Sequence, residues 1–310
     1  MIGSSNNVDE SQNLSLENSN ESGSSSRIVM ATTPNELVPP KWSGTKLLSE
    51  EGRIYQKIKD VLPPIMKNRI TITAIHLCMR SGPVEESRFE VYSENVKMVT
   101  RARGRRVDSS GWYGTSAKNV DSLMRRGFEM NSIVPASYPH GVGIYLSHFL
   151  SPQISDMMSD IDENGEKHII LCQFILGNSE KVELGSKQLF PSSADFDTGV
   201  DDLTNPKVYV VWCGNMNTHI LPRYIISYKP IHHHMYLGRL TCGGHADNTW
   251  SKILFKLHNF LTISQRLELR KLCMSYGDGT PVEEETFMRD LRSIVGDDQL
   301  IGSIMLEISS

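Results

Sequence analysis

Residues 111–116 read Gly-Trp-Tyr-Gly-Thr-Ser. Two further segments of similar character follow, His-Gly-Val-Gly-Ile-Tyr-Leu-Ser at 140–147 and Ile-Leu-Pro-Arg-Tyr-Ile-Ile-Ser-Tyr at 220–228. In the first segment an aromatic residue, a glycine and a hydroxyl side chain stand close together, which suits a site for a small planar ligand. The bulky Tyr113 stands directly before Gly114. These segments decide the fold, and they raise the question of whether the site still performs chemistry.

The region around these segments, residues 41–235, mixes short β-rich runs with few helices. Runs rich in β-branched and aromatic residues, bounded by Gly, Pro, Asn and Asp, predict strands. These runs are 69–76, 88–96, 168–177, 208–213 and 224–228. Helices are expected at 49–61 and at 118–127, where Gly127 ends the second one. The pattern predicts an α+β domain with an antiparallel sheet.

The segments on either side of this domain have different compositions. Residues 1–40 are rich in Ser and Asn with few large apolar side chains, so we expect a disordered tail. Residues 236–248 are expected to form a linker, preceded by the adjacent histidines His232, His233 and His234. Adjacent side chains on regular structure cannot all face one metal ion, so a solvated segment is favoured and no metal site is predicted.

From residue 249 onward the apolar residues recur at helical spacing. Capping signals separate four short helices: Ser264 before the second, the Thr280–Glu283 capping box before the third, and Asp297 or Asp298 before the fourth. We therefore predict a small all-α four-helix module over 249–310. It carries more Asp and Glu than Lys and Arg, so it is poorly suited to phosphates. An apolar groove for an amphipathic partner peptide is the functional expectation.

Bulk composition limits the classes of function. The chain has 310 residues, a net charge of −4 and five cysteines. A mildly acidic chain has no overall electrostatic footprint for nucleic acid or a membrane surface, so no direct nucleic-acid binding is expected. No run reaches the ~20 apolar residues of a membrane span. Scattered cysteines without a Cys-x-x-Cys pair are typical of a reduced, intracellular protein.

Together, the three opening segments resemble the ADP-ribosyltransferase fold of poly(ADP-ribose) polymerases (PARPs). That family carries Trp-His-Gly-Ser/Thr, then Gly-x-Gly-Ile-Tyr, then a Glu before a Tyr-Ile/Leu-Val/Ile strand. Order and spacing match over about residues 50–230, most clearly at 112–115 and 143–145. The resemblance implies a PARP catalytic-like sheet domain with a pocket for NAD, in which Gly114, Thr115 and Tyr145 would contact the cofactor.

The chemical positions depart from the family pattern. The resemblance places the catalytic residues at Tyr113, Tyr145 and Arg223, where the family has His, Tyr and Glu. The family's carboxylate stabilises an oxocarbenium-like cation. Arg stays protonated, and two like charges ~4 Å apart repel by several kcal/mol at an effective dielectric of about 20. Counted without gaps, the family's later Ser and second stacking Tyr fall on Gln153 and Asp156, and neither residue matches.

We therefore expect a pseudoenzyme with no catalytic residues, no cofactor and at most a vestigial NAD pocket. Two alternatives stay open. One is weak mono-ADP-ribosyl transfer by a rearranged site, and the other is a sensor that binds NAD or ADP-ribose without turnover.

A degenerate PARP-like domain followed by a helical module resembles the plant SRO family ("similar to radical-induced cell death one"). The C-terminal part resembles that family's RST module at 249–260 and 279–300. The resemblance implies a nuclear regulator of stress responses and development. Its RST module would bind short disordered segments of transcription factors that fold on binding. The expected partner-binding residues are Leu257, Phe260, Leu261, Leu272, Ile294, Asp297 and Asp298.

The arginine run at 101–106 allows two interpretations, a nuclear localisation signal or a solvated loop of the sheet domain. The second interpretation is favoured for the run itself. Nuclear placement therefore depends on the family resemblance.

Overall fold

The computed structural model describes residues 41–80, 82–130 and 140–231. In the C-terminal part it describes 253–254, 256–257, 260–262, 265–266, 268–269, 271–272 and 284–309. The chain divides into two units, Met1–Pro39 and Pro40–Ser310. The predicted tail and the predicted linker lie outside the described residues.

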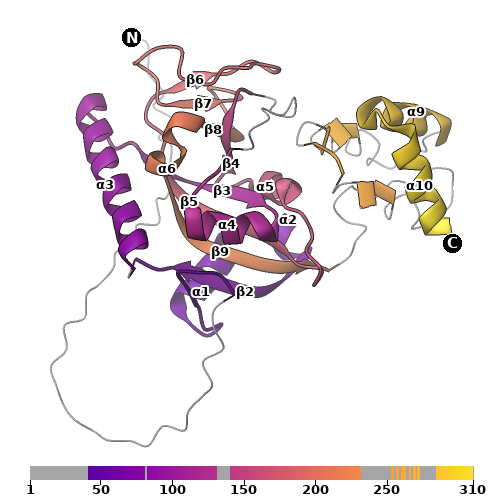
Figure 1. Ribbon diagram of the computed structural model, residues 1–310, viewed down its shortest axis with the longest axis horizontal. Helices are drawn as coiled ribbons and strands as arrows, with labels where there is room; N and C mark the ends of the chain where they lie inside the picture. The colour runs from indigo at the N-terminus through magenta and orange to yellow at the C-terminus, as the bar shows by residue number, and fades with distance from the viewer. Residues whose placement is uncertain are drawn as a thin grey trace, which may run out of the picture. The chain divides into compact units, whose positions relative to one another are not determined.

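One mixed but mainly antiparallel sheet dominates the described residues (Figure 1). Its strands are β1 (Thr45–Leu47), β2 (Ile70–Cys78), β3 (Asp108–Thr115), β4 (Gly143–His148), β5 (Lys167–Ile175), β6 (Ser179–Lys181), β7 (Thr198–Val200), β8 (Val208–Trp212) and β9 (Ile220–Pro230). The order across the sheet is β1-β2-β9-β5-β3-β4-β8-β7-β6, and only the pair β6–β7 is parallel. The predicted α+β class is confirmed, as are the strands expected around β2, β5, β8 and β9.

Helices connect the strands and cover the sheet. They are α1 (Arg53–Val61), α2 (Pro64–Lys67), α3 (Pro83–Arg103), α4 (Ala117–Arg126), α5 (Pro152–Met158), the 3₁₀ turn η1 (Cys213–Asn215), α6 (Met216–His219), α9 (Glu284–Val295) and α10 (Asp298–Ser309). The predicted helix before Gly127 is confirmed as α4, with the Gly127 N–H bonded to the Leu123 carbonyl. None of the helices in the described ranges combines the length and apolar character that a bilayer crossing needs.

The prediction of a strand at 88–96 is wrong, because these residues lie inside α3. Apolar and polar residues alternate locally there, which imitates a strand. The buried positions, Tyr92 and Val99, are however spaced by seven, as on one helical face. The helix ends at Gly104, whose φ of +65° is a left-handed cap conformation that glycine adopts without strain.

The centre of the sheet is buried between helices. Trp112 of β3 and Ile170 of β5 are completely buried, and α4 packs Val120 and Leu123 into the apolar cluster that contains Ile170. A second cluster joins α3 to β5 and β9 through Tyr92, Val99, Val107, Ile175 and Leu221. The three sequence segments that suggested the fold form strands β3, β4 and β9 of this core.

The arginine run at 101–106 is part of the folded sheet domain. Three of its four arginines bind neighbouring groups: Arg103 pairs with Asp197, Arg105 donates to Asn178 and to the Gly177 carbonyl, and Arg106 pairs with Asp108. These bonds support the structural interpretation of the run, because a transport signal has to be accessible as an extended peptide.

The described C-terminal residues form another apolar cluster. Its buried members include Leu257, Phe287, Leu291 and Ile301. Gly296 ends α9 with a φ of +68°, and Asp297 caps α10 by accepting a hydrogen bond from the Leu300 N–H. The third and fourth predicted helices are therefore confirmed. The first two are described only in fragments, and Ser264, Cys273, Gly277 and the box at 280–283 lie outside the described residues.

Candidate functional site

A cavity of about 270 Å³ lies beside the end of β3. Its walls include Tyr113, Gly114 and Thr115 of β3 and Tyr145 of β4. The structure thus brings together the four pocket residues expected from the sequence. Arg223 is not among the described residues that line the cavity.

Gly114 is required by the backbone of the α5 segment. A Cβ atom at this position would stand 1.7 Å from the Ser155 carbonyl oxygen. Ser155 is completely buried, and its Oγ donates to the Trp112 carbonyl at 2.6 Å. Neighbouring residues on a strand point to opposite faces. Gly114 accordingly faces α5, while Tyr113 packs edge-on against Phe128 on the other face. Packing alone therefore explains the glycine, whether or not a ligand binds.

Thr115 is engaged within the fold on both its side chain and its backbone. Its Oγ1 accepts a hydrogen bond from Asn119 Nδ2 at 3.1 Å, and its carbonyl accepts one from Ser159 Oγ at 3.1 Å. Thr115 as a whole is only 5% exposed. A ligand amide would compete with these protein partners.

Tyr145 is a buried core aromatic with a satisfied hydroxyl. Its Oη donates to the Gly141 carbonyl at 2.7 Å and accepts from the His140 N–H at 2.8 Å. Its ring belongs to an apolar cluster with Met158, Val210 and others. The side chain fixes the loop that precedes β4 and is only 3% exposed. The family's stacking Tyr is thus present in the sequence but serves the packing of its own loop.

Arg223 is held away from the cavity. Its Nη1 donates to Gln173 Oε1 at 2.6 Å. Gln173 pairs with Ser110 of β3, which lies about 13 Å along the strand from Gly114 at ~3.3 Å per residue. The pairing of β5 with β9 is irregular at Leu171/Cys172, where Arg223 has no direct strand partner. The position that would need a carboxylate therefore presents a cation bonded to a side-chain amide.

The gap-free count to Gln153 and Asp156 does not locate the pocket wall. Neither residue lines the cavity, whereas Met158, two residues further along, does. Asp156 is instead a structural anion: it is 2% exposed, it pairs with Lys167 Nζ at 3.2 Å and it accepts a hydrogen bond from the Tyr228 hydroxyl. Sequence analysis did not predict Met158, because a count without gaps says nothing of how the segment after β4 packs.

The described lining of the pocket offers few groups to a dinucleotide. At about 270 Å³ the cavity is at the small end of ordinary small-ligand sites, which span ~300–1,000 Å³. The charged side chains among its described lining residues are Glu129, Asp160 and Arg266. Glu129 is paired with Arg126, and Asp160 is paired with Arg266. A pyrophosphate would therefore meet two carboxylates and a single cation that is already neutralised.

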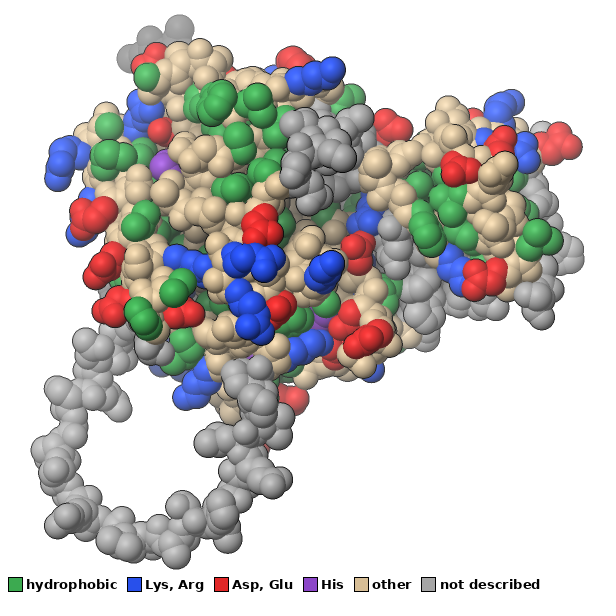
Figure 2. Space-filling view, in the orientation of Figure 1, with side chains coloured by type: hydrophobic (Ala, Val, Ile, Leu, Met, Phe, Trp, Pro, Cys, Tyr) green, Lys and Arg blue, Asp and Glu red, His purple; other side chains and the backbone are tan. Residues whose placement is uncertain are grey.

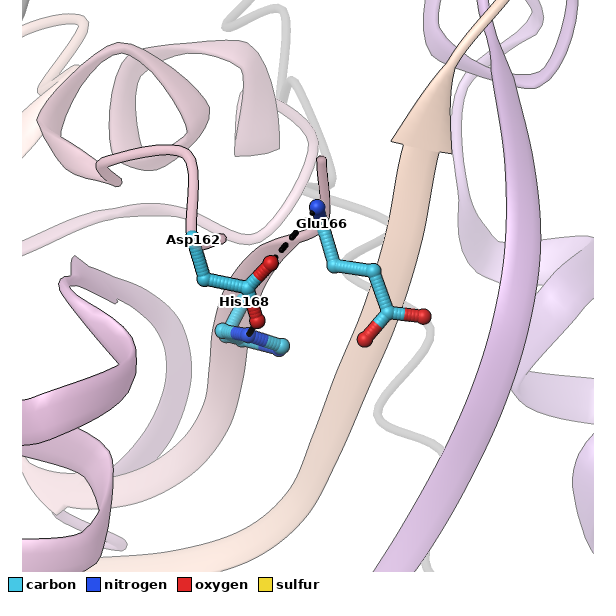
Figure 3. A group of neighbouring side chains, drawn as sticks. All are labelled: Asp162, Glu166 and His168. Atoms are coloured by element: carbon cyan, nitrogen blue, oxygen red, sulfur yellow. Dashed lines mark hydrogen bonds and ion pairs between the residues drawn. The ribbon is translucent and has the colours of Figure 1, made fainter. Parts of the chain in front are cut away.

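A separate group of polar side chains, Asp162, Glu166 and His168, has the composition of a metal site (Figure 3). Lys41 occupies the place where a cation would act, with its Nζ 2.7 Å from Glu166 Oε2 and 3.4 Å from Asp162 Oδ2. His168 Nε2 bonds Asp162 at 3.1 Å, and Trp42 packs edge-on against the His168 ring. This cluster is a network of ion pairs that fastens residues 41–42 to the sheet, so it offers a metal ion no free ligand set.

Four titratable groups in and beside this network have pKa values below their ordinary values. Burial lowers the pKa of His168 and of the neighbouring His76. Burial would raise the pKa of Asp162, but hydrogen bonds from the Glu166 N–H and from His168 bring it below its ordinary value. The pKa of Glu166 is lowered in the same way by hydrogen bonds from Lys41 and Thr73. The folded protein therefore resists protonation at all four groups.

The expected partner-binding residues of the C-terminal module differ in exposure. Leu257 and Leu261 are buried, Leu272 and Ile294 are partly buried, and Phe260 is 65% exposed. Asp297 is used as the cap of α10, and Asp298 forms an ion pair with Arg292 at 3.4 Å. Phe260 is the apolar residue of this set that the fold leaves accessible.

On the face of the molecule shown in Figure 2, basic side chains near the centre lie beside acidic ones. This interspersed charge is unlike the continuous basic stripe that grips a nucleic acid.

Comparisons with known proteins give PARP-like relatives, which include plant proteins named as probable inactive polymerases and, at 23% identity over 217 residues, "Protein mono-ADP-ribosyltransferase PARP10" of Mus musculus. No protein-family model matches the chain. It is 34% identical over 216 residues to "Probable inactive poly [ADP-ribose] polymerase SRO5" of Arabidopsis thaliana, covering 69% of this chain and 68% of that protein. It is 31% identical over 198 residues to the similarly named SRO2 of the same plant, covering 61% of this chain but only 60% of that protein.

A solved structure agrees with these sequence relatives. The PARP domain of Arabidopsis RADICAL-INDUCED CELL DEATH1 superposes with a TM-score of 0.52 and 26% sequence identity, covering 58% of this chain and 99% of that domain. The sheet domain therefore has the PARP-domain fold.

We expect the free energy of unfolding to fall as the pH is lowered from about 8 to about 4. The unfolded chain takes up protons on His76 and His168 near pH ~6.5 and on Asp162 and Glu166 near pH ~4, whereas the folded chain resists. Stability from these groups is thus present at high pH and lost as the pH falls. Urea titrations at several pH values measure the free energy of unfolding. In a His168→Gln variant this free energy should change less with pH between pH ~7 and ~5. Equal stability across this range would contradict the assignment.

A Gly114→Ala substitution should lower the free energy of unfolding by about 1–3 kcal/mol, because the new Cβ would overlap the Ser155 carbonyl. Gly302→Ala in α10 is the matched control, since a Cβ there meets nothing within 4 Å. The control should be neutral or stabilising by roughly 0.5–1 kcal/mol, as expected for Gly→Ala inside a helix. Chemical denaturation without added ligand compares the two, and a Gly114→Ala protein as stable as the parent would disprove the packing requirement.

Proposed function

The chain belongs to the SRO family of PARP-like proteins, and on that premise we propose that it is an inactive ADP-ribosyltransferase-like regulator. The observation that carries the proposal is the state of Arg223, which replaces the catalytic Glu and is bonded to Gln173 at 2.6 Å. Transfer of ADP-ribose passes through a cationic transition state, which a nearby carboxylate stabilises and a guanidinium opposes. The relatives' printed names describe them, too, as probable inactive polymerases.

Three further observations support a loss of chemistry. Tyr113 stands where the family has His, and its ring packs against Phe128. The Tyr145 hydroxyl is bonded to its own loop. Counted without gaps, the family's second stacking Tyr falls on Asp156, which does not match, and Met158 is the lining residue of this segment. Each difference removes one contact that would orient or stabilise NAD.

We further propose that the protein acts by binding transcription factors through its C-terminal module, in the nucleus, as part of stress and developmental responses. The family resemblance and the exposed Phe260 beside buried Leu257 and Leu261 support this role. An exposed aromatic at the edge of a stable apolar core is the kind of residue that anchors an amphipathic peptide. Because arginines of the run at 101–106 are engaged in the sheet domain, nuclear entry would depend on another segment or on a partner.

A weak mono-ADP-ribosyltransferase or an NAD-responsive sensor is the second candidate. It is favoured only by the retained walls Gly114, Thr115 and Tyr145 around the cavity.

With millimolar NAD, the full chain should release no nicotinamide and should label neither itself nor an added protein. The single variant Arg223→Glu should stay inactive, because Tyr113 still replaces the family's His. Chromatographic detection of nicotinamide and transfer from labelled NAD measure both. Release by the unmodified chain above the rate in buffer would overturn the proposal, whereas binding heat without release would favour the sensor.

Phe260→Ala should leave the free energy of unfolding unchanged and weaken peptide binding by roughly thirty-fold, the effect of losing an aromatic hot spot of about 2 kcal/mol. Leu257→Ala, at a fully buried position, should instead destabilise the module by about 2–5 kcal/mol. A displayed library of transcription-factor segments supplies the ligands, and fluorescence anisotropy measures affinity. Equal affinity of Phe260→Ala and the parent for every selected peptide would exclude Phe260 as an anchor.

A further inference from the structure

We propose that the cavity beside Gly114 binds a guanidinium group, the side chain of Arg266 from the chain's own C-terminal module, in place of a dinucleotide. This inference rests on the proposed loss of NAD chemistry, because the side chain helps to close the cavity in which the family resemblance would place the cofactor. It assigns the pocket a new ligand class and makes it a docking site for the module.

Arg266 is bound like a ligand. The residue is only 8% exposed, which is rare for arginine unless its charge is paired. Nη2 lies 2.8 Å from Asp160 Oδ1, and Nη1 donates to the Met157 carbonyl at 3.4 Å. Nε donates to the Leu261 carbonyl at 2.9 Å. Two of these acceptors belong to the segment that ends α5, and one belongs to the module.

The cavity wall includes residues from the same stretch of the module. Leu261, Thr262 and Arg266 line it together with Gly114 and Tyr145. The three residues are therefore part of the pocket in which the family's cofactor would lie.

The charge of the pocket fits a cation. The carboxylates Glu129 and Asp160 are the acidic groups among the described lining residues, and Arg266 is the basic one. Glu129 already has Arg126 as a partner, so Asp160 is the carboxylate that Arg266 neutralises. A buried guanidinium is stable only when its N–H groups find acceptors, and here a carboxylate and two carbonyls provide them. The same lining disfavours a pyrophosphate.

The module presents Arg266 from a fixed position. The preceding Gln265 donates from Nε2 to the carbonyls of Ile294 and Val295, at the end of α9, at 2.9 Å each. Its Oε1 in turn accepts from the Thr262 N–H and hydroxyl. Thr262 and Gln265, the described neighbours of Arg266, are thus tied to the end of α9 in the module. Docking of Arg266 therefore positions the module as a unit, including the exposed Phe260 a short distance before it in the chain.

Charge reversal in the full chain tests the docking. Arg266→Asp and Asp160→Arg should each make backbone amides of segments 158–162 and 260–266 exchange hydrogen at least about tenfold faster, the change produced by ~1.4 kcal/mol of lost contact. The double variant Asp160→Arg/Arg266→Asp should restore slow exchange, since the pair is re-formed with its charges swapped. Lys271→Asp is the matched control for charge on the same segment and should behave like the parent.

Three outcomes would overturn the proposal. The first is that amides exchange at the same rate in Arg266→Asp and in Lys271→Asp. The second is that the double variant does not restore slow exchange, although its circular dichroism spectrum is that of the parent. The third is that the slow exchange of the parent is lost when the protein is diluted. The last outcome would mean that a second copy supplies the arginine. Nicotinamide release by the unmodified chain is a separate measurement. It would overturn the proposed function and leave the exchange result standing, so the two failures can be told apart.

Discussion

The pocket depends on one close approach, that of the Ser155 carbonyl to the backbone of Gly114. No other residue type fits, because any Cβ would overlap the carbonyl oxygen. Once α5 lies against β3, its side chains are fixed in turn. Ser155 and Ser159 bind carbonyls of β3, and Asp156 meets Lys167 and Tyr228 in a buried network. The residues that end this segment, from Met158 to Asp160, then form one wall of the cavity. The shape of the site follows from packing and does not need a ligand.

This dependence explains how chemistry can disappear while the fold persists. The residues that build the walls, such as Ile144 and Tyr145, are also core residues, and replacing them would cost free energy of folding. The positions that would carry out the reaction contribute less to the core. Tyr113 still packs on Phe128, and Arg223 finds Gln173. Substitutions at such positions remove transition-state stabilisation with little effect on folding, so the site loses its chemistry first.

The sequence predicted the strands β2, β5, β8 and β9 and several residues of the pocket wall, because short β-rich runs and three motifs in order carry local signals. The strand prediction at 88–96 was wrong, because local alternation of apolar and polar residues there resembles a strand. The residues form part of α3 instead, which buries Tyr92 and Val99 on one face. Met158 was not predicted, because a count without gaps after Tyr145 says nothing of how that segment packs. The bonds of Arg266 could not be foreseen either, since Asp160 and Arg266 are distant in sequence and only the fold brings them together.

A buried arginine in a former cofactor site has a consequence for regulation. Any two events that use the same contact are coupled, and the coupling is reciprocal. A peptide that binds near Phe260 and prefers the docked module would strengthen the Arg266–Asp160 contact, and a peptide that prefers the released module would weaken it. An anion small enough to enter the cavity would compete for Arg266 and shift the same balance. In this arrangement the degenerate domain would contribute to partner choice through a salt bridge, with no need for the reaction that its fold performs elsewhere.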